Sequence, residues 1–491
     1  MNSKIQGFIN TIKDKKVAVV GIAVSNTPLI EFLSRHGARV TAFDKQEAEA
    51  IADRIERLQP LNIEYRLGPG YLEGLKGFDW IFKTPVIRPD LPEFIAERER
   101  GAILTSEMEL FIDLCPATVF GVTGSDGKTT TTTLIYEILR ARGYNCHLGG
   151  NIGRPLLSDV GSMKATDMAI VELSSFQLLT MTKSVNVAVI TNLSPNHLDV
   201  HTSYDEYTGA KKNIFIHQAN DDFIVLNYDN EETRGFGCLA PGRLGYFSRA
   251  DGPGLARLFD NDNKLFAAAY SYEGRIMYRS RSDLTGGEKN IHPVDTTHVI
   301  NEDEILIPGP HNVENYLAAT CAVRRYAGRD DIGAVARTFG GVEHRIEYFR
   351  TIGGARYFND SIASSPNRTM ACLNTFDQKI ILIAGGQDKK LDYSPLGRYI
   401  AEKVKVLILC GETSRQIKRS LMNYCEMIGL PCTVPIYECE SYEDAVSAAY
   451  NNAKANDVVV LSPASTSFDR FKNFEERGRV YKDLVNSLPA R

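Results

Sequence analysis

The chain has 491 residues, 43% of them hydrophobic and 24% charged, which is the composition of an ordinary globular protein and enough chain for two to four domains. Its formal net charge of −5 at pH 7 gives no general attraction to nucleic acid or to anionic lipid, so we expect small-molecule partners, with no nucleic acid and no membrane. No apolar run approaches the roughly 18 residues of a membrane-spanning helix, no apolar signal core opens the chain, and the nine cysteines form no C-x-x-C pair, so we expect a cytoplasmic protein with reduced thiols.

The first elements that the pattern predicts form a β-α-β unit. Residues 16–22 read as a buried strand, a helix follows near residues 25–36, and a second strand runs over residues 38–44. The turn after the first strand lacks the G-x-G-x-x-G pattern of dinucleotide-binding proteins, but a helix N-terminus can still receive a diphosphate, and Asp44 lies where a partner of the ribose would lie. A Rossmann-like half without any ligand is the alternative that this stretch alone leaves open.

A further strand at residues 79–83 and a helix over about 106–114 continue this unit. Between them, Thr84 and a proline form a turn, and Pro116 ends the helix. We therefore expect a first domain at residues 1–115.

Residues 118–133, T-V-F-G-V-T-G-S-D-G-K-T-T-T-T-T, read as a buried strand, a glycine-rich turn and the start of a helix. The glycines let the turn aim backbone N–H groups at an anion, Lys128 adds a mobile positive charge, and Thr129 offers a hydroxyl to a phosphate-bound Mg²⁺. The strict G-x-x-x-x-G-K-[ST] spacing needs a glycine where the chain has Val122, so the match is to a variant of the motif. A glycine-rich turn that only connects two elements is the alternative. We expect ATP as the ligand, bound by Gly124, Ser125, Asp126, Gly127, Lys128, Thr129 and Thr130.

Polar side chains follow two further strands of this predicted sheet. Glu172 ends the strand at 168–172, where a carboxylate beside a phosphate turn can hold a metal ion directly or through water. The strand at 185–192 runs into S-P-N-H-L-D, so His197 lies at the edge where open α/β sheets gather ligands. A histidine without a functional role is the alternative for His197.

The helix that follows, over residues 204–215, contains two adjacent lysines, Lys211 and Lys212. Neighbouring residues of a helix point in different directions, so at most one of the two ammonium groups faces the predicted site. A solvated helix face is the alternative for both.

Residues 246–305 are polar with short apolar alternations, which predicts β-hairpins and indicates no chemistry. From residue 341 on, strands alternate with helices, which predicts a second α/β domain. The strands are expected at 379–384, 405–410 and 457–461, and the helices near 393–402, 412–428 and 441–453.

Five stretches, in this order and spacing, resemble the Mur ligases, which are ATP-dependent amide ligases of peptidoglycan precursors: G-V-T-G-S-D-G-K-T-T, G-G-N-I-G, E-L-S-S-F-Q, T-N-L-S-P-N-H-L-D and G-A-K-K-N-I-F. In addition, P-G-P-H-N-V-E-N at 308–315 is similar to the family's H-N-x-x-N helix, and E-H-R-I-E at 343–347 to its H-R-x-E segment. The resemblance covers nearly the whole chain. It implies an α/β fold with a Rossmann-like N-terminal domain (1–115), a central P-loop ATPase domain with a parallel sheet (116–340) and a C-terminal Rossmann-like domain (341–491).

The resemblance also implies the reaction: ATP converts the carboxylate of UDP-N-acetylmuramoyl-L-alanine to an acyl phosphate, which the amine of glutamate attacks. Phosphoryl transfer needs Mg²⁺ and positive charge at the moving oxygens, which gives Lys128, His197 and Lys211 catalytic roles. The implied metal ligands are Thr129, Glu172, His197 and Lys211. The family uses a carbamylated lysine as an extra carboxylate for a second Mg²⁺, and the alignment of G-A-K-K-N-I-F assigns it to Lys211.

The remaining implied site residues fall into two groups. The first group binds the nucleotide, with Asn312 and Asn315 at the adenine and Arg345 and Asp360 at the phosphates and ribose. The second group binds the other two substrates and comprises Asp44, Thr84, Asn151, Ser174, Ser364, Lys389, Ser467 and Phe474. Of these, Ser364, Lys389, Ser467 and Phe474 are the expected contacts of glutamate, with a cation that pairs with its side-chain carboxylate.

Two departures from the family pattern affect the expected glutamate pocket: Ile362 stands where a lysine is usual, and Phe468 stands where a leucine is usual. They leave open whether D- or L-glutamate is added. The stretch S-P-A-S-T-S-F-D-R-F-K-N-F at 462–474 favours a muramoyl substrate over that of a folylpolyglutamate-synthase-like ligase. A P-loop binding or switch protein that makes no bond is the alternative of another class. We expect a monomer.

Overall fold

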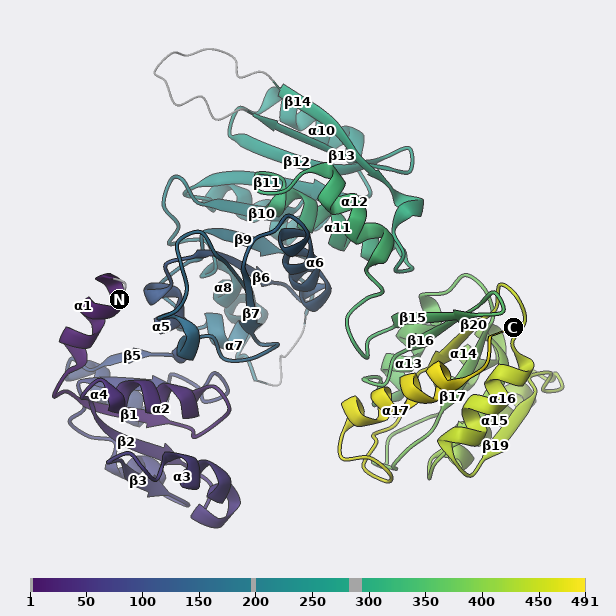
Figure 1. Cartoon of the computed structure of the whole chain (residues 1–491), viewed down its shortest axis with the longest axis horizontal. Helices are drawn as coiled ribbons and strands as arrows, with labels where there is room; N and C mark the ends of the chain where they lie inside the picture. Colours follow the sequence, from purple (N-terminus) through teal and green to yellow (C-terminus); the bar gives the residue numbers. More distant parts are fainter. Residues whose placement is uncertain (1–2, 196–199, 282–293, 491) are drawn as a thin grey trace. The chain divides into compact units, whose positions relative to one another are not determined.

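The computed structural model describes residues 3–195, 200–281 and 294–490. The fold is α/β, as predicted, with three sheets in which parallel strand pairs dominate (Figure 1). The chain divides into two compact units, one of Met1–Glu304 with Val313–Ala336 and one of Ile305–Asn312 with Arg337–Arg491. The domain limits at residues 115 and 340 stay a prediction.

The first sheet has the strand order β3-β2-β1-β4-β5, and all its pairs are parallel. Its central strands are apolar and buried on both faces, which is typical of parallel sheets covered by helices. The strand order reverses between β1 and β4, and open α/β sheets bind ligands at such a point. The strands are β1 (Lys16–Val20), β2 (Arg39–Asp44), β3 (Glu64–Leu67), β4 (Trp80–Lys83) and β5 (Ile103–Thr105). The helices are α1 (Ser3–Ile12), α2 (Asn26–Arg35), α3 (Ala52–Leu58), α4 (Pro92–Glu99) and α5 (Glu107–Leu114).

The second sheet has the order β14-β13-β12-β11-β10-β9-β6-β8-β7. It is parallel from β7 to β12, and β13 and β14 add an antiparallel extension. Strand β6 lies between β8 and β9, so the ends of these three strands meet at one edge. The strands are β6 (Thr118–Thr123), β7 (Cys146–Gly150), β8 (Met168–Glu172), β9 (Val187–Ile190), β10 (Phe223–Asn227), β11 (Arg243–Ser248), β12 (Leu265–Tyr272), β13 (Arg275–Arg281) and β14 (Val294–Asn301). The helices that follow these strands are α6 (Lys128–Ala141), α7 (Ser175–Leu178), α8 (Tyr204–Lys212), α9 (Glu231–Gly235), α10 (Gly252–Asn261), α11 (Pro310–Val323) and α12 (Arg329–Thr338).

The stretch at 246–305 differs in part from the hairpins that its pattern predicts. Strands β12, β13 and β14 do pair antiparallel, so the prediction is right for them. It is wrong for Gly252–Asn261, which form helix α10. Asp251 caps this helix by accepting from Gly254 N, and Leu255 and Phe259, one turn apart, are buried.

The third sheet has the order β15-β16-β20-β17-β18-β19, and β15 is antiparallel to β16. The other pairs are parallel, so the carboxyl ends of β16, β20 and β17 lie side by side. The strands are β15 (Glu347–Ile352), β16 (Ala355–Asn359), β17 (Ile380–Ala384), β18 (Val404–Cys410), β19 (Ile436–Cys439) and β20 (Val458–Leu461). Apolar clusters cover both faces of this sheet, supplied by α13 (Pro366–Asn374), α14 (Leu396–Lys403), α15 (Ser414–Met427), α16 (Tyr442–Asn452) and α17 (Phe474–Ser487).

All nine cysteines are free thiols within the described residues. Cys238 is exposed, Cys146, Cys432 and Cys439 are half-buried, and the other five are buried. None of the helices in the described part of the chain combines the length and the apolar character that a bilayer crossing requires.

Candidate active site

The glycine-rich turn between β6 and α6 has the shape of an anion cradle. Gly124 has φ 147° and Gly127 has φ 78°, and a side chain at either position would meet the side chain of Thr191 or Asn315. Backbone and side chain of Asn192, just past β9, accept from Ser125 N and Asp126 N, each at 2.9 Å. The turn is therefore fixed from the neighbouring strand, with the N-terminus of α6 behind it, where backbone N–H groups favour an anion.

Helix α6 begins at Lys128, and its threonine-rich first turns are stabilised locally. Thr132 and Thr133 each donate their hydroxyl to the carbonyl four residues earlier, at 2.8 Å. Lys128 is half-buried, and its Nζ donates to Gly124 O at 3.0 Å and to Ser125 O at 2.8 Å. The ammonium group is thus folded over the turn that would hold the phosphates.

Thr129 and Glu172 come together at the ends of α6 and β8. Thr129 Oγ1 donates to Glu172 Oε2 at 2.7 Å, and Asn151 Nδ2 donates to Glu172 Oε1 at 2.8 Å. Adjacent ligands of an octahedral Mg²⁺ lie about 3 Å apart, because the Mg–O bonds are about 2.0–2.1 Å long. The spacing of the two oxygens, one hydroxyl and one carboxylate, therefore fits two neighbouring ligands of this ion.

Lys211 lies buried at the end of β6. Its Nζ donates to Thr123 Oγ1 at 3.1 Å and to Gly124 O at 2.9 Å. Burial lowers the pKa of Lys211 to about 7, and the positive charge of Lys128 adds to the lowering. A large fraction of the side chain is therefore a neutral amine near neutral pH, which an ordinary lysine is not.

Ser174 follows β8 and caps the short helix α7. Its Oγ accepts from Gln177 N at 3.3 Å, while Ser174 N donates to Gln177 Oε1 at 2.9 Å. Ser174 thus lies two residues beyond Glu172, at the same edge of the sheet. His197 lies outside the described residues, so its role stays a prediction.

The two asparagines expected at the adenine both lie on α11. Asn315 is buried and accepts from Thr131 Oγ1 of helix α6 at 3.2 Å, which ties it to the helix of the phosphate turn. Asn312 is also buried, and its Nδ2 donates to Pro308 O at 2.6 Å.

The two residues expected to bind the UDP-sugar in the first sheet lie at the ends of β2 and β4. Asp44 is buried, and its carboxylate accepts from Ile22 N at 2.7 Å and from Gln46 N at 2.9 Å. Thr84 is buried against Gly21, the residue that follows β1. Both residues therefore shape the turn at the point where the strand order reverses.

In the second unit, Asp360 follows β16 and is buried beside the end of β20. Ser462 Oγ donates to its Oδ2 at 2.7 Å, and Ile346 N to its Oδ1 at 3.3 Å. Burial raises the pKa of Asp360 to about 7. Arg345 is exposed, and its charge acts to lower the pKa of Asp360.

The four residues expected at glutamate all lie at the carboxyl edge of the third sheet, beyond β16, β17 and β20. Lys389 is exposed, and its Nζ lies 5.3 Å from the centroid of the Phe468 ring, next to the buried Ser467. Gln387 N donates to Thr466 O at 2.9 Å, which pairs the turn after β17 with the turn after β20. Phe474 is tied to the turn after β16, because its carbonyl oxygen accepts from Ser361 Oγ at 2.8 Å. The structure thus brings Lys389 close to Ser467.

Sequence reasoning missed Arg477, which is fully buried behind this edge. Its guanidinium donates to Ser361 Oγ at 3.0 Å, to Ser361 O at 2.8 Å and to Ser465 O at 3.0 Å. These bonds join the turns after β16 and β20. An arginine in the first turn of an amphipathic helix gives no sequence signal that distinguishes it from a solvated one.

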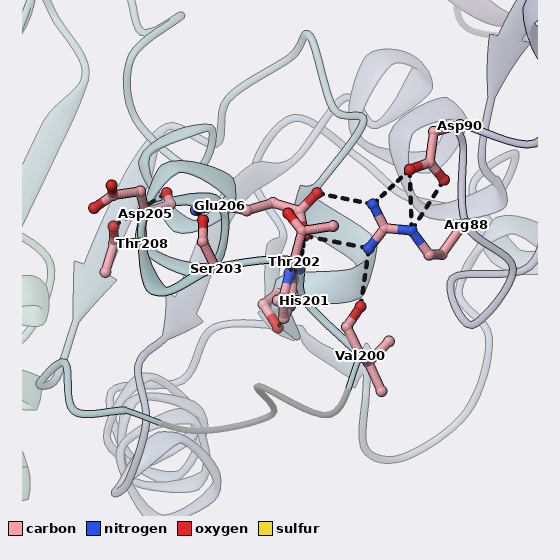
Figure 2. Close-up of polar contacts among 10 residues, drawn as sticks. Arg88, Asp90, Val200, His201, Thr202, Ser203, Asp205, Glu206 and Thr208 are labelled. Atoms are coloured by element: carbon pink, nitrogen blue, oxygen red, sulfur yellow. Dashed lines mark hydrogen bonds and ion pairs between the residues drawn. The ribbon is translucent and has the colours of Figure 1, made fainter.

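Sequence reasoning also missed a polar cluster beside α8, drawn in Figure 2, in which Arg88 lies between Asp90 and Glu206. The two sides of the Arg88–Glu206 pair are 118 residues apart in the chain. Contacts of such separation leave no local pattern in a single sequence.

Comparison with known proteins gives two family-model matches: "Mur ligase middle domain" over residues 122–323 and "Mur ligase, glutamate ligase domain" over residues 344–465. Two curated relatives named UDP-N-acetylmuramoylalanine--D-glutamate ligase are similar over full length. The protein of Acetivibrio thermocellus is 52% identical and covers 100% of both chains. That of Ruminiclostridium cellulolyticum is 49% identical over 99% of this chain and 100% of its own. A crystal structure of UDP-N-acetylmuramate-alanine ligase from Thermotoga maritima shares the fold, with a TM-score of 0.51, 18% identity and coverage of 96% and 99%.

Proposed function

The chain belongs to the Mur ligase family, and from this premise we propose that it is the ATP-dependent ligase that adds D-glutamate to UDP-N-acetylmuramoyl-L-alanine in peptidoglycan precursor synthesis. The reaction forms an amide through an acyl phosphate and gives ADP and phosphate. The observation that carries the proposal is 52% identity over the full length of a relative with this name. The phosphate turn between β6 and α6, with Lys128 folded over it, supports the ATP-dependent step.

We propose that Lys128 and the N-terminus of α6 bind the phosphates of ATP. A carboxylate is a poor electrophile, so its oxygen must first take the γ-phosphoryl group. Charge that builds up on the transferred group is stabilised by donors already held in place, and Lys128 is held by two carbonyls of the turn itself. When ATP binds, the ammonium exchanges these carbonyls for phosphate oxygens.

Mg²⁺ is used by Mur ligases in general, and Thr129 and Glu172 would hold it here. Their oxygens, 2.7 Å apart, have the chemistry and the spacing that this ion requires. When bound, the ion neutralises charge on the phosphates. Asn151, by donating to Glu172 Oε1, keeps the other carboxylate oxygen in a fixed orientation.

We propose that Lys211 is carbamylated. A neutral amine adds to carbon dioxide, forms an N–C bond and releases one proton, which leaves a carbamate in place of a cation. The support is the burial of Lys211 and its pKa of about 7, which makes the amine nucleophilic near neutral pH. The carbamate would give His197 and Glu172 a further anionic partner for a second metal ion.

We propose further that Asn312 and Asn315 contact the adenine, that Arg345 and Asp360 contact the rest of the nucleotide, and that Ser364, Lys389, Ser467 and Phe474 line the glutamate site. Two of the last four, Lys389 and Ser467, lie where the turns after β17 and β20 meet. Asp44, Thr84, Asn151 and Ser174 would bind the UDP-sugar. The protein would act as a monomer in the cytoplasm, within the domain limits 1–115, 116–340 and 341–491.

One assay tests the proposal: purified protein with ATP, Mg²⁺ and UDP-N-acetylmuramoyl-L-alanine, and with D- or L-glutamate in separate reactions, read by phosphate release and by the mass of the product. Product formation with D-glutamate alone is the expected result. Product with L-glutamate alone would identify an L-glutamate-adding relative instead. Phosphate release without the UDP-sugar, or with a folate substrate in its place, would contradict the proposal.

A further inference from the structure

Arg88 joins two sheets of the first unit. It lies in the loop after β4, four residues beyond Thr84, and its guanidinium binds both oxygens of Glu206 on α8, with Nη2 to Oε1 at 2.9 Å and Nη1 to Oε2 at 3.2 Å (Figure 2). Asp90 accepts from its Nε and Nη2 at 2.9 and 2.7 Å, and Val200 O accepts from Nη1 at 2.9 Å. A bidentate arginine–carboxylate pair fixes distance and orientation together.

Glu206 also contacts His201 and so links it to Arg88. Its Oε2 accepts from Thr202 N at 2.8 Å and lies 3.2 Å from His201 Nδ1. Arg88 lowers the pKa of Glu206 to about 2, so the carboxylate is ionised and can only accept hydrogen bonds. The proton of the imidazole is therefore on Nδ1, and in the neutral ring Nε2 accepts from the Ser175 hydroxyl, 2.9 Å away.

The order carboxylate, histidine, serine is that of a hydrolase triad, but this set is not one. His201 and Ser175 are each only 3% exposed, so no substrate reaches the hydroxyl. The contacts instead run into the proposed active site. Ser175 is the third residue after Glu172, and His201 packs edge-on against Tyr207 at 5.4 Å.

Tyr207 completes the connection. Its hydroxyl lies 2.9 Å from Ser125 Oγ of the phosphate turn, and its ring centroid lies 4.8 Å from Lys211 Nζ. One continuous set of contacts thus leads from the loop after Thr84 to the residues that the proposed mechanism uses in the central sheet.

We propose that Arg88 is a positioning residue for the UDP-linked precursor. Together with Glu206, His201 and Ser175 it forms a set of contacts, here called the Arg88 bridge, that holds the loop after β4 in a fixed position relative to the strand ends of the central sheet. The inference rests on the proposed function, in which precursor contacts are divided between Thr84 on one side and Asn151 and Ser174 on the other. A ligand that spans two elements binds more tightly when they are held in place beforehand. The phosphate turn has further supports of its own in Asn192 and Thr191, so the inference predicts a much smaller effect of the bridge on ATP binding than on precursor binding.

The test compares KM values in Arg88→Ala. The KM for UDP-N-acetylmuramoyl-L-alanine is expected to rise about tenfold, the effect of losing a charge-assisted hydrogen bond, while the KM for ATP stays within about twofold. Arg88→Lys keeps the charge but cannot bind both carboxylate oxygens in the same way, so its KM for the precursor is expected to lie between those of the wild type and Arg88→Ala. The exchange Arg88→Glu with Glu206→Arg is expected to recover part of the loss.

Arg57→Ala is the matched control, because Arg57 also forms a partly exposed pair in the first unit, with Glu31 at 2.6 Å, away from these contacts. It is expected to leave all KM values unchanged. An unchanged precursor KM in Arg88→Ala and Arg88→Lys, or equal rises for precursor and ATP, would overturn the inference. A wild-type protein without ligase activity would contradict the proposed function instead. Calorimetric binding of UDP-N-acetylmuramoyl-L-alanine, which needs no turnover, would then test the bridge by the same comparison.

Discussion

Lys211 and Lys212 are adjacent on α8, yet their ammonium groups lie in different surroundings. Lys211 Nζ is 2.9 Å from the carbonyl oxygen of Gly124, whereas Lys212 Nζ is 4.7 Å from the centroid of the Phe236 ring. Lys211→Ala is therefore expected to be nearly inactive, because it removes the group that faces the phosphate turn. Lys212→Ala is expected to stay close to wild type in the same assay. Equal losses in the two variants would contradict the assignment.

The carbamate on Lys211 has a direct readout. Protein incubated with isotopically labelled bicarbonate is expected to show one carbamate signal by NMR, and the signal is expected to be lost in Lys211→Ala and kept in Lys212→Ala. Added bicarbonate is not expected to restore activity to Lys211→Ala, since the amine itself is gone. A carbamate signal that persists in Lys211→Ala would place the modification elsewhere.

Lys128→Ala is expected to reduce kcat by about 10²-fold or more, as for other donors aimed at the charge of a transition state. The fold is expected to be intact, because the carbonyls of Gly124 and Ser125, to which the ammonium donates, belong to the phosphate turn and not to an apolar core. Far-UV circular dichroism and the melting temperature check this. Arg140→Ala, on the exposed face of the same helix, is the matched control. Near-normal turnover in Lys128→Ala would contradict the assignment of this turn as the site of the ATP phosphates.

Lys389→Ala is expected to raise the KM for glutamate by about 10- to 100-fold, which corresponds to the loss of a charge-assisted hydrogen bond, and to leave the KM for ATP and for the UDP-sugar within a few-fold. The reason is that Lys389 is exposed at the edge of the third sheet, close to Phe468 and Ser467. Because Ile362 adds no second cation, glutamate is also expected to bind more weakly at high salt. Lys390→Ala is the control. Equal rises for all three substrates would show that the glutamate site lies elsewhere.

The buried carboxyl of Asp360 predicts a pH dependence of stability. Its pKa is raised to about 7, so the folded protein binds more protons than the unfolded chain between about pH 4 and pH 7. Stability from this group is complete below about pH 4 and is lost as the pH rises through about 7. The free energy of unfolding of the wild type, relative to that of Asp360→Asn, is therefore expected to fall between about pH 4 and pH 7, by an amount on the order of 1–3 kcal/mol. Melting temperatures of both proteins across this pH range check it. A constant difference would show that the carboxyl is solvated.

Lys83 is expected to give a pH dependence of stability of the opposite sign. It is 1% exposed, its Nζ donates to Thr84 O at 3.4 Å, and burial lowers its pKa to about 8. The folded protein then binds fewer protons than the unfolded chain between pH 8 and 10.5, so stability rises with pH across this range. Lys83→Met is expected to raise the free energy of unfolding at neutral pH by about 1–3 kcal/mol, because it replaces a buried cation with an apolar side chain. The melting temperature should rise accordingly. A lower melting temperature would mean that the ammonium is well solvated or paired.

The elements that the sequence predicted well are those whose signal is local. The strand at 168–172 and the turn before α6 have apolar runs, glycines and a helix start that need no partner to be recognised. Helix α10 was missed because its buried apolar side chains, Leu255 and Phe259, follow two glycines and a proline, which indicate a turn.

In the candidate site, too, the features with a local sequence signal were predicted and those that depend on distant residues were not. Glycine spacing indicated the cradle, but it gave no sign that Lys128 is half-buried or that Asn192 supports the turn. Arg477 and Arg88 could not be found from the sequence, because their partners are brought near by sheet order and not by spacing.

The unequal exposure of the nine thiols allows a dye to be attached at one chosen site, from which the distance between the two compact units can be measured. Alkylation requires the thiolate, and burial raises the pKa of Cys115 and Cys410 to about 11 and that of Cys146 to about 12. Cys238, just after α9, is exposed. A maleimide dye should therefore attach at Cys238 first in the unmodified chain, and a second dye on an introduced surface cysteine beyond residue 340 would report the distance between the two compact units by energy transfer as each substrate is added.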